Sequence, residues 1–220
     1  METVLLFVLE ILACFGGVVA FEKLWKKSGV VSWVSLIIIL ANIQIYKYVD
    51  IPFGTTSVGS VAFASIFLGV DIINEKYGEQ DAKDIIKILF GVSVASFVIG
   101  NLTLAYPGVE GDTVGQCVDT VLNYTPLASI ASTGCMLLAS YFDVKIFNAI
   151  KRAFPNQLWL RNNVSTMITN ISENVLFFAI AVLPYAGFEV YITVVLVKSC
   201  LEFICALFDT PFLYLSKWLG

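Results

Sequence analysis

The sequence predicts an all-α membrane protein that crosses the bilayer about seven times. Three observations support this fold class: an excess of apolar residues, a shortage of charge, and apolar runs as long as a bilayer is thick. Of the 220 residues, 58% are hydrophobic and 14% are charged, and the mean hydropathy is +0.85. A soluble domain carries roughly 25% charged residues. A chain with so little charge can place its apolar side chains only against lipid.

Seven segments are long and apolar enough to cross the membrane. The bilayer core offers the backbone no hydrogen-bond partners, so each crossing must be a helix of about 20 mostly apolar residues. The predicted crossings are residues 3–21, 30–49, 56–73, 85–106, 127–150, 164–186 and 188–215. The segments between them are too short for a second domain. We therefore expect one membrane domain over residues 1–220.

The seven segments differ in the polar residues within and beside them. The first has no basic segment before it and is followed by lysines, so we expect a retained span rather than a cleaved signal peptide. The third and the fifth carry polar residues in their C-terminal halves. The sixth and the seventh are joined by a short turn at residues 184–188, which predicts an antiparallel helix pair.

Almost all basic residues fall in every second segment between the spans, and these segments would lie on the same side of the membrane. Cytoplasmic loops of membrane proteins carry an excess of Lys and Arg. With the N-terminus outside, the cytoplasmic segments collect Lys23, Lys26, Lys27, Lys76, Lys83, Lys87, Lys145, Lys151, Arg152, Arg161 and Lys217. The external segment 107–126 contains acidic residues but no Lys or Arg. We therefore expect an external N-terminus and a cytoplasmic C-terminus in a bacterial inner membrane.

Several kinds of chemistry are disfavoured by the residues that the chain lacks. It has no histidine, which removes histidine proton relays and most zinc sites. Its five cysteines form no C-x-x-C pair, and all but Cys117 lie in apolar runs, where Cys acts as a small hydrophobic side chain. We expect no disulfide, metal or other cofactor. The absence of a G-x-x-x-x-G-K-[ST] loop predicts no ATP hydrolysis by this chain.

An unusual number of polar side chains falls inside the predicted spans. A charged side chain at mid-bilayer costs at least about 2.5–3.5 kcal/mol, so these residues should face the bundle interior or a watery cavity. Asp71 with Glu75 and Lys198 with Glu202 are spaced four residues apart, so each pair shares one helix face. The structural alternative is that such groups join helices through hydrogen bonds worth about 0.6 kcal/mol each.

We predict that eight of these residues bind a small polar substrate. Amides present a donor and an acceptor together, and carboxylates accept from ring N–H groups and exocyclic amines. Such a set suits a planar solute rich in hydrogen-bonding groups. The predicted site comprises Asn42, Gln44, Lys47, Asp71, Glu75, Asn170, Glu173 and Lys198.

Five blocks of sequence carry a family resemblance. They are ANIQ at 41–44 with Lys47, DIINEKYG at 71–78, SYFDVKIF at 140–147, WLRNNVST at 159–166, and Lys198 with DTPFLY at 209–214. In this order they resemble the YhhQ/VUT family of queuosine-precursor transporters. The resemblance implies uptake of a 7-deazaguanine base, a nitrile or aminomethyl precursor or queuine itself, for tRNA modification. It also implies Asp where this chain has Glu173, whose longer side chain fits a differently sized substrate.

The same family is similar to the membrane-embedded substrate-binding subunits of energy-coupling-factor transporters. That likeness implies a six-helix core plus one further helix, and it leaves open a separate energising ATPase module or a homodimer. Besides the substrate and the lipid bilayer, we expect no nucleic acid as a direct partner. The alternatives are a transporter of another vitamin-like or nucleobase solute, a membrane-embedded enzyme, and a purely structural protein.

Overall fold

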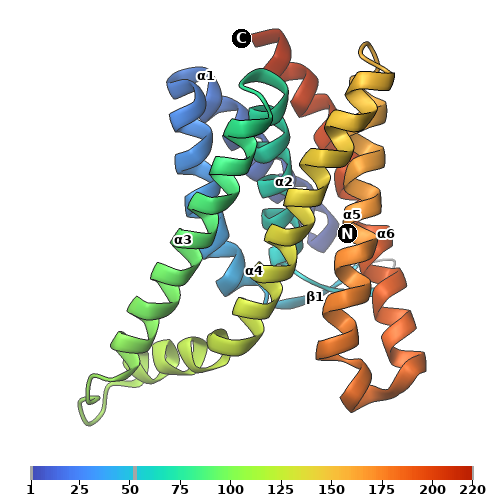
Figure 1. Ribbon diagram of the computed structural model, residues 1–220. Helices are drawn as coiled ribbons and strands as arrows, with labels where there is room; N and C mark the ends of the chain where they lie inside the picture. Colours follow the sequence, from blue (N-terminus) through green and yellow to red (C-terminus); the bar gives the residue numbers. More distant parts are fainter. Residues whose placement is uncertain (1, 52–53, 220) are drawn as a thin grey trace.

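The computed structural model describes residues 2–51 and 54–219 and confirms a helical fold. Figure 1 shows the helices side by side as an elongated bundle. The elements in chain order are α1 (Glu2–Gln44), β1 (Tyr48–Ile51), β2 (Gly54–Ser57), α2 (Gly59–Lys76), α3 (Glu79–Leu104), α4 (Thr113–Ala153), α5 (Leu158–Ala181) and α6 (Leu183–Leu219). By length and composition, three helical stretches of the described residues could cross a membrane: Thr3–Gln44, Glu79–Leu104 and Leu183–Leu219.

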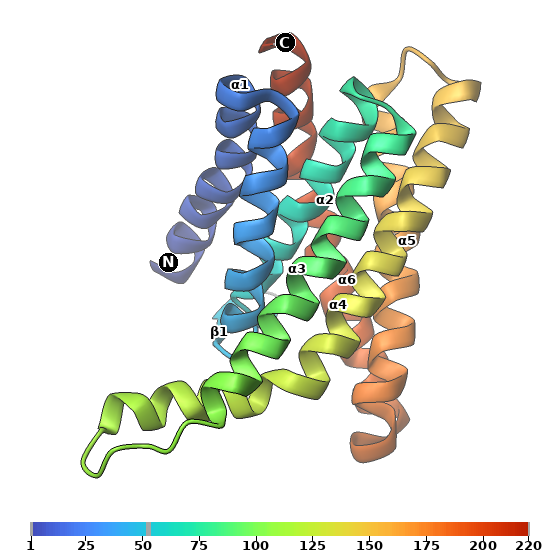
Figure 2. The ribbon, with the colours of Figure 1, turned by 60° about the vertical axis from the view of Figure 1, so that its left-hand side comes forward.

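Helix α1 contains the first two predicted spans. Lys26 has a non-helical backbone with φ 56° and ψ −140°, so the chain doubles back there (Figure 2). The two halves approach closely at Gly29, where an added Cβ would lie 2.0 Å from the carbonyl oxygen of Phe21. Glycine at this position therefore allows the tight turn between the two halves.

A short β-hairpin follows α1 and was not predicted. Strands β1 and β2 pair antiparallel, from Tyr48 opposite Ser57 to Ile51 opposite Gly54. As a result, the second predicted span ends early, at Gln44 rather than residue 49, and the third begins late, at Gly59 rather than residue 56. The cause is local, because β-branched and aromatic residues favour extended backbone even beside apolar helices.

Helices α4 and α6 also differ from their predicted bounds. Helix α4 begins at Thr113, within the predicted external segment 107–126, and Asp112 accepts a hydrogen bond from the backbone N–H of Gly115 at 2.8 Å. Its first part is roughly perpendicular to the bundle and projects sideways from the end opposite the C-terminus, before the helix turns into the bundle (Figure 2). The predicted turn at 184–188 is confirmed, because Gly187, with φ 81°, breaks the helical backbone near the start of α6.

Helix α2 is the centre of the bundle. It packs against α1, α3, α4 and α6, and almost all of its residues from Gly59 to Asn74 are buried. An added Cβ at Gly69 would lie 2.4 Å from a methyl carbon of Val34, so this glycine permits close packing of α2 on α1. Helices α1, α3 and α6 expose large apolar side chains, among them Leu5, Ile99 and Leu196. A surface with so many exposed apolar side chains is the one expected of helices that face lipid.

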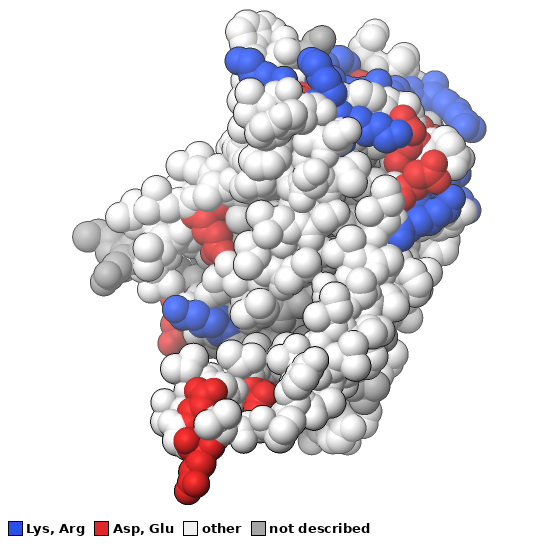
Figure 3. Space-filling view, turned by 90° about the vertical axis from the view of Figure 1, so that its left-hand side faces the viewer, with Lys and Arg blue, Asp and Glu red and all other residues white. Residues whose placement is uncertain are grey.

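Charges are unevenly distributed along the bundle. Figure 3 shows Lys and Arg gathered mainly at one end of the molecule, while acidic side chains project from the other. The basic end is also where α1 doubles back and where the C-terminus lies (Figures 1 and 2). The distribution agrees with the expected alternation of basic loops.

Candidate functional site

The first of three polar clusters inside the bundle surrounds Lys198. In this lysine cluster, the Lys198 Nζ donates to Ser60 Oγ at 2.6 Å and lies 3.3 Å from Glu202 Oε1. Asn174 Nδ2 donates to the other Glu202 oxygen at 2.6 Å and to Ser199 Oγ at 3.2 Å. The cluster thus joins α2, α5 and α6. It offers one cation, an amide, hydroxyls and a carboxylate within a largely apolar shell.

Glu173 is the second acidic member of the lysine cluster. It lies within electrostatic range of both Lys198 and Glu202. The antiparallel pair predicted for the sixth and seventh spans would let Glu173 and Lys198 meet near mid-membrane. The ion pair of Lys198 is instead with Glu202, one turn along α6. The spacing of Lys198 and Glu202 was visible in the sequence. Ser60 and its contact with Lys198 carried no such signal.

The second group, the carboxyl cluster, consists of Asp71, Asp143 and Asp209 with Asn162. The three acids come from α2, α4 and α6, and each is at most 1% exposed. Asn162 Nδ2 donates to Asp209 Oδ1 at 2.6 Å, and Asp71 lies within hydrogen-bonding range of Asp143. Thus Asp71, a predicted substrate-binding residue, is surrounded by acids rather than by cations.

The third group, the arginine cluster, surrounds Glu75 at the basic end of the bundle. Glu75 forms ion pairs with Arg161 at 2.7 Å, Lys151 at 2.7 Å and Lys217 at 3.0 Å. The four residues come from α5, α4, α6 and α2, so one carboxylate ties four helices together. Arg161 is 1% exposed and also donates to the Pro155 carbonyl at 2.8 Å. Sequence reasoning placed Glu75 in the site but did not include these three cations.

A smaller ion pair lies beside the arginine cluster. Lys76 contacts the buried Glu22 at 2.8 Å, and the Tyr77 hydroxyl donates to the same carboxylate at 3.2 Å. Burial raises the pKa of the Tyr77 hydroxyl, and the negative charge of Glu22 adds to this shift. These contacts connect α1 to the C-terminal end of α2 and to the residue that follows it.

The predicted residues of α1 and the following segment separate in space. Gln44 Nε2 donates to Glu10 Oε1 at 3.1 Å, which joins the two halves of α1. Asn42 instead donates to the Ile38 carbonyl at 2.8 Å and accepts from Thr133 at 3.4 Å. Lys47 is exposed, in the short segment before β1. The structure therefore does not bring these three side chains together.

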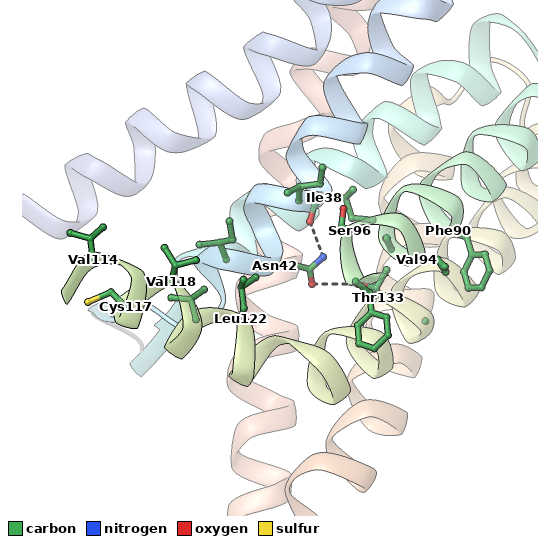
Figure 4. Close-up of a pocket in the computed structure, with 16 residues that line it drawn as sticks. Ile38, Asn42, Phe90, Val94, Ser96, Val114, Cys117, Val118, Leu122 and Thr133 are labelled. Carbon is green, nitrogen blue, oxygen red and sulfur yellow. Dashed lines mark hydrogen bonds between the residues drawn. The ribbon is translucent and has the colours of Figure 1, made fainter. Parts of the chain in front are cut away.

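Asn42 is also the one predicted site residue that lines a cavity of about 530 Å³ (Figure 4). The walls come from α1, α3 and the first part of α4, and they are mainly apolar, with Phe90, Val94, Val118 and Leu122 among them. The charged residues of the three clusters do not line this cavity. An apolar cleft of this kind suits a lipid chain better than a polar solute, so we place the candidate site at the lysine cluster.

A polar stripe on α5 connects the lysine cluster to the carboxyl cluster. Asn162, Thr166, Asn170 and Asn174 recur every four residues, and each is at most 7% exposed. Asn170, a predicted site residue, thus lies between the two clusters, and its Oδ1 is buried without a hydrogen-bond partner in the described structure. The stripe gives the bundle a continuous polar interior.

Comparison with known proteins identifies the family. A family model described as "Putative vitamin uptake transporter" matches residues 57–216, which contain the whole of the lysine and carboxyl clusters. The chain belongs to this vitamin uptake transporter family. Membership makes it a multi-pass membrane protein and indicates a transporter rather than an enzyme. The family resemblance found in the sequence is thereby confirmed.

One curated relative aligns with most of the chain. It is a Bacillus subtilis (strain 168) protein named "Probable queuosine precursor transporter". The two are 26% identical over 202 residues, which cover 91% of this chain and 88% of the relative. No solved structure matches the chain.

Proposed function

We propose that this chain imports a queuosine precursor, a 7-deazaguanine base or queuine, across the bacterial inner membrane for use in tRNA modification. The observation that carries the proposal is the lysine cluster, a partly buried set of complementary polar groups inside the family-matched region. The name of the Bacillus subtilis relative supports the substrate class.

The lysine cluster suits the hydrogen-bonding edges of a deazaguanine. Such a base presents ring N–H groups and an exocyclic amine as donors and a carbonyl as an acceptor. Glu173 and Glu202 can accept from the donors, and Lys198 can donate to the carbonyl. Asn170, whose buried Oδ1 lacks a partner, adds another acceptor near the cluster. We assign the recognition of the base to these four residues.

The other predicted residues then take positions along the path. Asn42, Gln44 and Lys47 lie toward the hairpin end of α1, and we propose that they line the external approach. Glu75 holds three cations together at the basic end, where it closes the path to the cytoplasm. Asp71 belongs to the carboxyl cluster, between the lysine cluster and this closure.

We also propose seven spans with an external N-terminus and a cytoplasmic C-terminus. Division of α1 at Lys26 and of α6 at Gly187 supports this count, since α1 then supplies two spans. The gathering of Lys and Arg at the end that carries the C-terminus supports the orientation (Figure 3).

A genetic experiment tests which substrate the chain imports. The gene is placed in cells that lack both queuosine synthesis and endogenous precursor uptake, and each precursor is supplied in turn while queuosine in tRNA is measured. We expect the wild-type gene and the Lys87→Ala variant, changed at an exposed lysine, to restore queuosine. The Lys198→Ala variant should not restore it. Failure of every precursor with a well-inserted wild-type protein would reject the assignment.

A second candidate function is the uptake of a different vitamin-like solute. The description of the family as a vitamin uptake transporter favours it. This function predicts that the wild-type gene restores growth of a vitamin-requiring strain but leaves tRNA without queuosine.

A further inference from the structure

The carboxyl cluster is not among the groups to which we assign recognition of the base, and its three acids lie deep in the bundle. Asp71 of α2, Asp143 of α4 and Asp209 of α6 are 0%, 1% and 1% exposed. Helix α5 covers them with neutral groups: Asn162 donates to Asp209 at 2.6 Å, and Thr169 donates to Asp143 at 3.3 Å. Four helices therefore converge on three carboxyl groups.

The cluster contains more acceptors than donors. Both oxygens of Asp71 and the Asn162 Oδ1 are buried without a hydrogen-bond partner in the described part of the protein. The Asn162 side chain is itself 0% exposed and contacts the cluster through its amide nitrogen. Buried acceptors without hydrogen-bond donors are costly, so this set is stable only when a bound group supplies the missing hydrogens.

A hydrogen bond between two carboxyl groups requires a proton on one of them. Asp71 and Asp143 are placed for such a bond. Three ionised carboxylates without a cation would repel one another strongly in a region of low dielectric constant. Among the described residues, no group of His, Cys, Asp or Glu has an arrangement that could hold a metal ion. A proton fits the cluster, because it supplies the hydrogen that a bond between the two carboxyl groups requires.

The charged surroundings do not neutralise the three acids. The other titratable group that faces Asp71 is Glu75, also on α2. The cations of α4, α5 and α6 at this end, Lys151, Arg161 and Lys217, are held by Glu75. On α1 and α3, Glu22 and Glu79 are themselves paired, with Lys76 and Lys83 respectively.

The cluster is also linked to the proposed site of the base. Lys198, Glu202 and Asp209 lie on one face of α6. Asp209 follows Lys198 by eleven positions, so the lysine and carboxyl clusters are about 16 Å apart along the helix. The polar stripe of α5 spans the same interval. A rearrangement of α6 that changes one cluster must therefore act on the other.

From this geometry we infer that the carboxyl cluster is a proton-binding site that couples uptake of the base to inward movement of a proton. The inference rests on the proposed transport function. An external proton forms an O–H bond with a carboxylate of the cluster, and that bond breaks when the proton leaves to the cytoplasm with the base. No other bond changes, and no oxidant or second reactant is needed.

The test uses the purified full chain in proteoliposomes with a labelled aminomethyl-deazaguanine as probe. Two rates are compared: accumulation driven by an interior more alkaline than the exterior, and exchange of internal for external probe at equal pH. With one proton per base, one pH unit supports up to about tenfold accumulation by wild type. Exchange requires no net proton movement. The Asp143→Asn and Asp209→Asn variants should therefore keep exchange and lose the pH-driven accumulation.

The control variant is Asp84→Asn, at an exposed acid of α3 paired with Lys87, and it should behave as wild type. The inference would be overturned if accumulation of the probe by the wild-type protein did not depend on the pH gradient, or depended on a sodium gradient instead. This outcome needs only the wild-type protein, so it holds even if no variant folds. Retention of the full pH response by both variants would overturn it as well. Absence of exchange by well-inserted wild type would identify failure of the transport function itself, and the coupling proposal would fall with it.

Discussion

Lys198 of α6 donates a hydrogen bond to Ser60 at the start of α2, with 2.6 Å between Nζ and Oγ, although 138 residues separate them in the chain. The same ammonium group lies 3.3 Å from Glu202 on its own helix, so it joins α6 to α2. It also places Lys198 at the junction of the most buried helix with the helix that carries Glu202. The predictions below follow from this junction and from the two clusters beyond it.

Replacement of Lys198 should abolish most uptake without removing the protein from the membrane. A hydrogen bond from a charged donor is worth about 1.5–3 kcal/mol, so we expect the Lys198→Ala variant to lose about 10- to 100-fold in uptake rate below saturation. The measurement is initial uptake normalised to the amount of inserted protein. The Lys87→Ala variant, at a lysine exposed to solvent, serves as its control. Equal rates in the two variants would remove Lys198 from the site.

Simultaneous apolar replacement separates recognition from structural pairing. A buried ion pair can be exchanged for well-packed apolar residues at little cost, whereas removing one partner leaves a costly unpaired charge. We expect a Lys198→Met, Glu202→Leu double variant to be at least as stable as the Lys198→Met variant and to remain inactive. Thermal melting in detergent and an uptake assay make the comparison. Full uptake by the double variant would show that the pair serves only to hold helices together.

Glu75 should matter chiefly for stability. The Glu75→Gln variant leaves the fully buried Arg161 without its counter-charge, and breaking a buried pair costs about 3–5 kcal/mol. The Lys217→Ala variant removes a half-exposed partner, for which about 0–1 kcal/mol is expected. In detergent, the apparent Tm of the first should fall by about 6 °C or more, and that of the second only slightly. Similar Tm values would mean that the arginine cluster does not hold the four helices.

The topology can be tested with an impermeant thiol reagent. Because Cys117 is exposed, the background carries Cys117→Ser. In that background, Gly108→Cys should be labelled from outside intact cells, since it lies in the segment between α3 and α4. Phe154→Cys, after α4 at the basic end, should react only after the cells are opened. The reverse pattern would contradict both the orientation and the span count.

The sequence predicted the helices better than it predicted the contacts between them. Apolar runs located every long helix because lipid imposes the same length and polarity on each crossing. The hairpin at residues 48–57 was missed, since strand propensity there competes with the adjoining apolar pattern. Asp143 and Asp209 lie in two of the sequence blocks that carry the family resemblance. Their convergence on Asp71 depends on tertiary packing, which no spacing within one helix encodes.

The candidate site was predicted in part for the same reason. Lys198 and Glu173 were identified because a charge within an apolar span is costly and must have a partner. Ser60 and Asn174, neutral residues that hold Lys198 and Glu202, gave a weaker signal, since Ser and Asn also serve as ordinary helix contacts. Glu75 was placed at the site from its spacing to Asp71. Its three cations lie on other helices and could be found only in the folded chain.

Direct uptake by the purified protein tests the central claim. Proteoliposomes that contain the wild-type chain or the Glu173→Gln variant are given a labelled deazaguanine precursor, with unlabelled queuine or biotin as competitor. We predict saturable uptake by wild type that queuine blocks and biotin does not, and little uptake by the variant. Uptake of another vitamin-like solute by wild type, with none of any deazaguanine, would contradict the account.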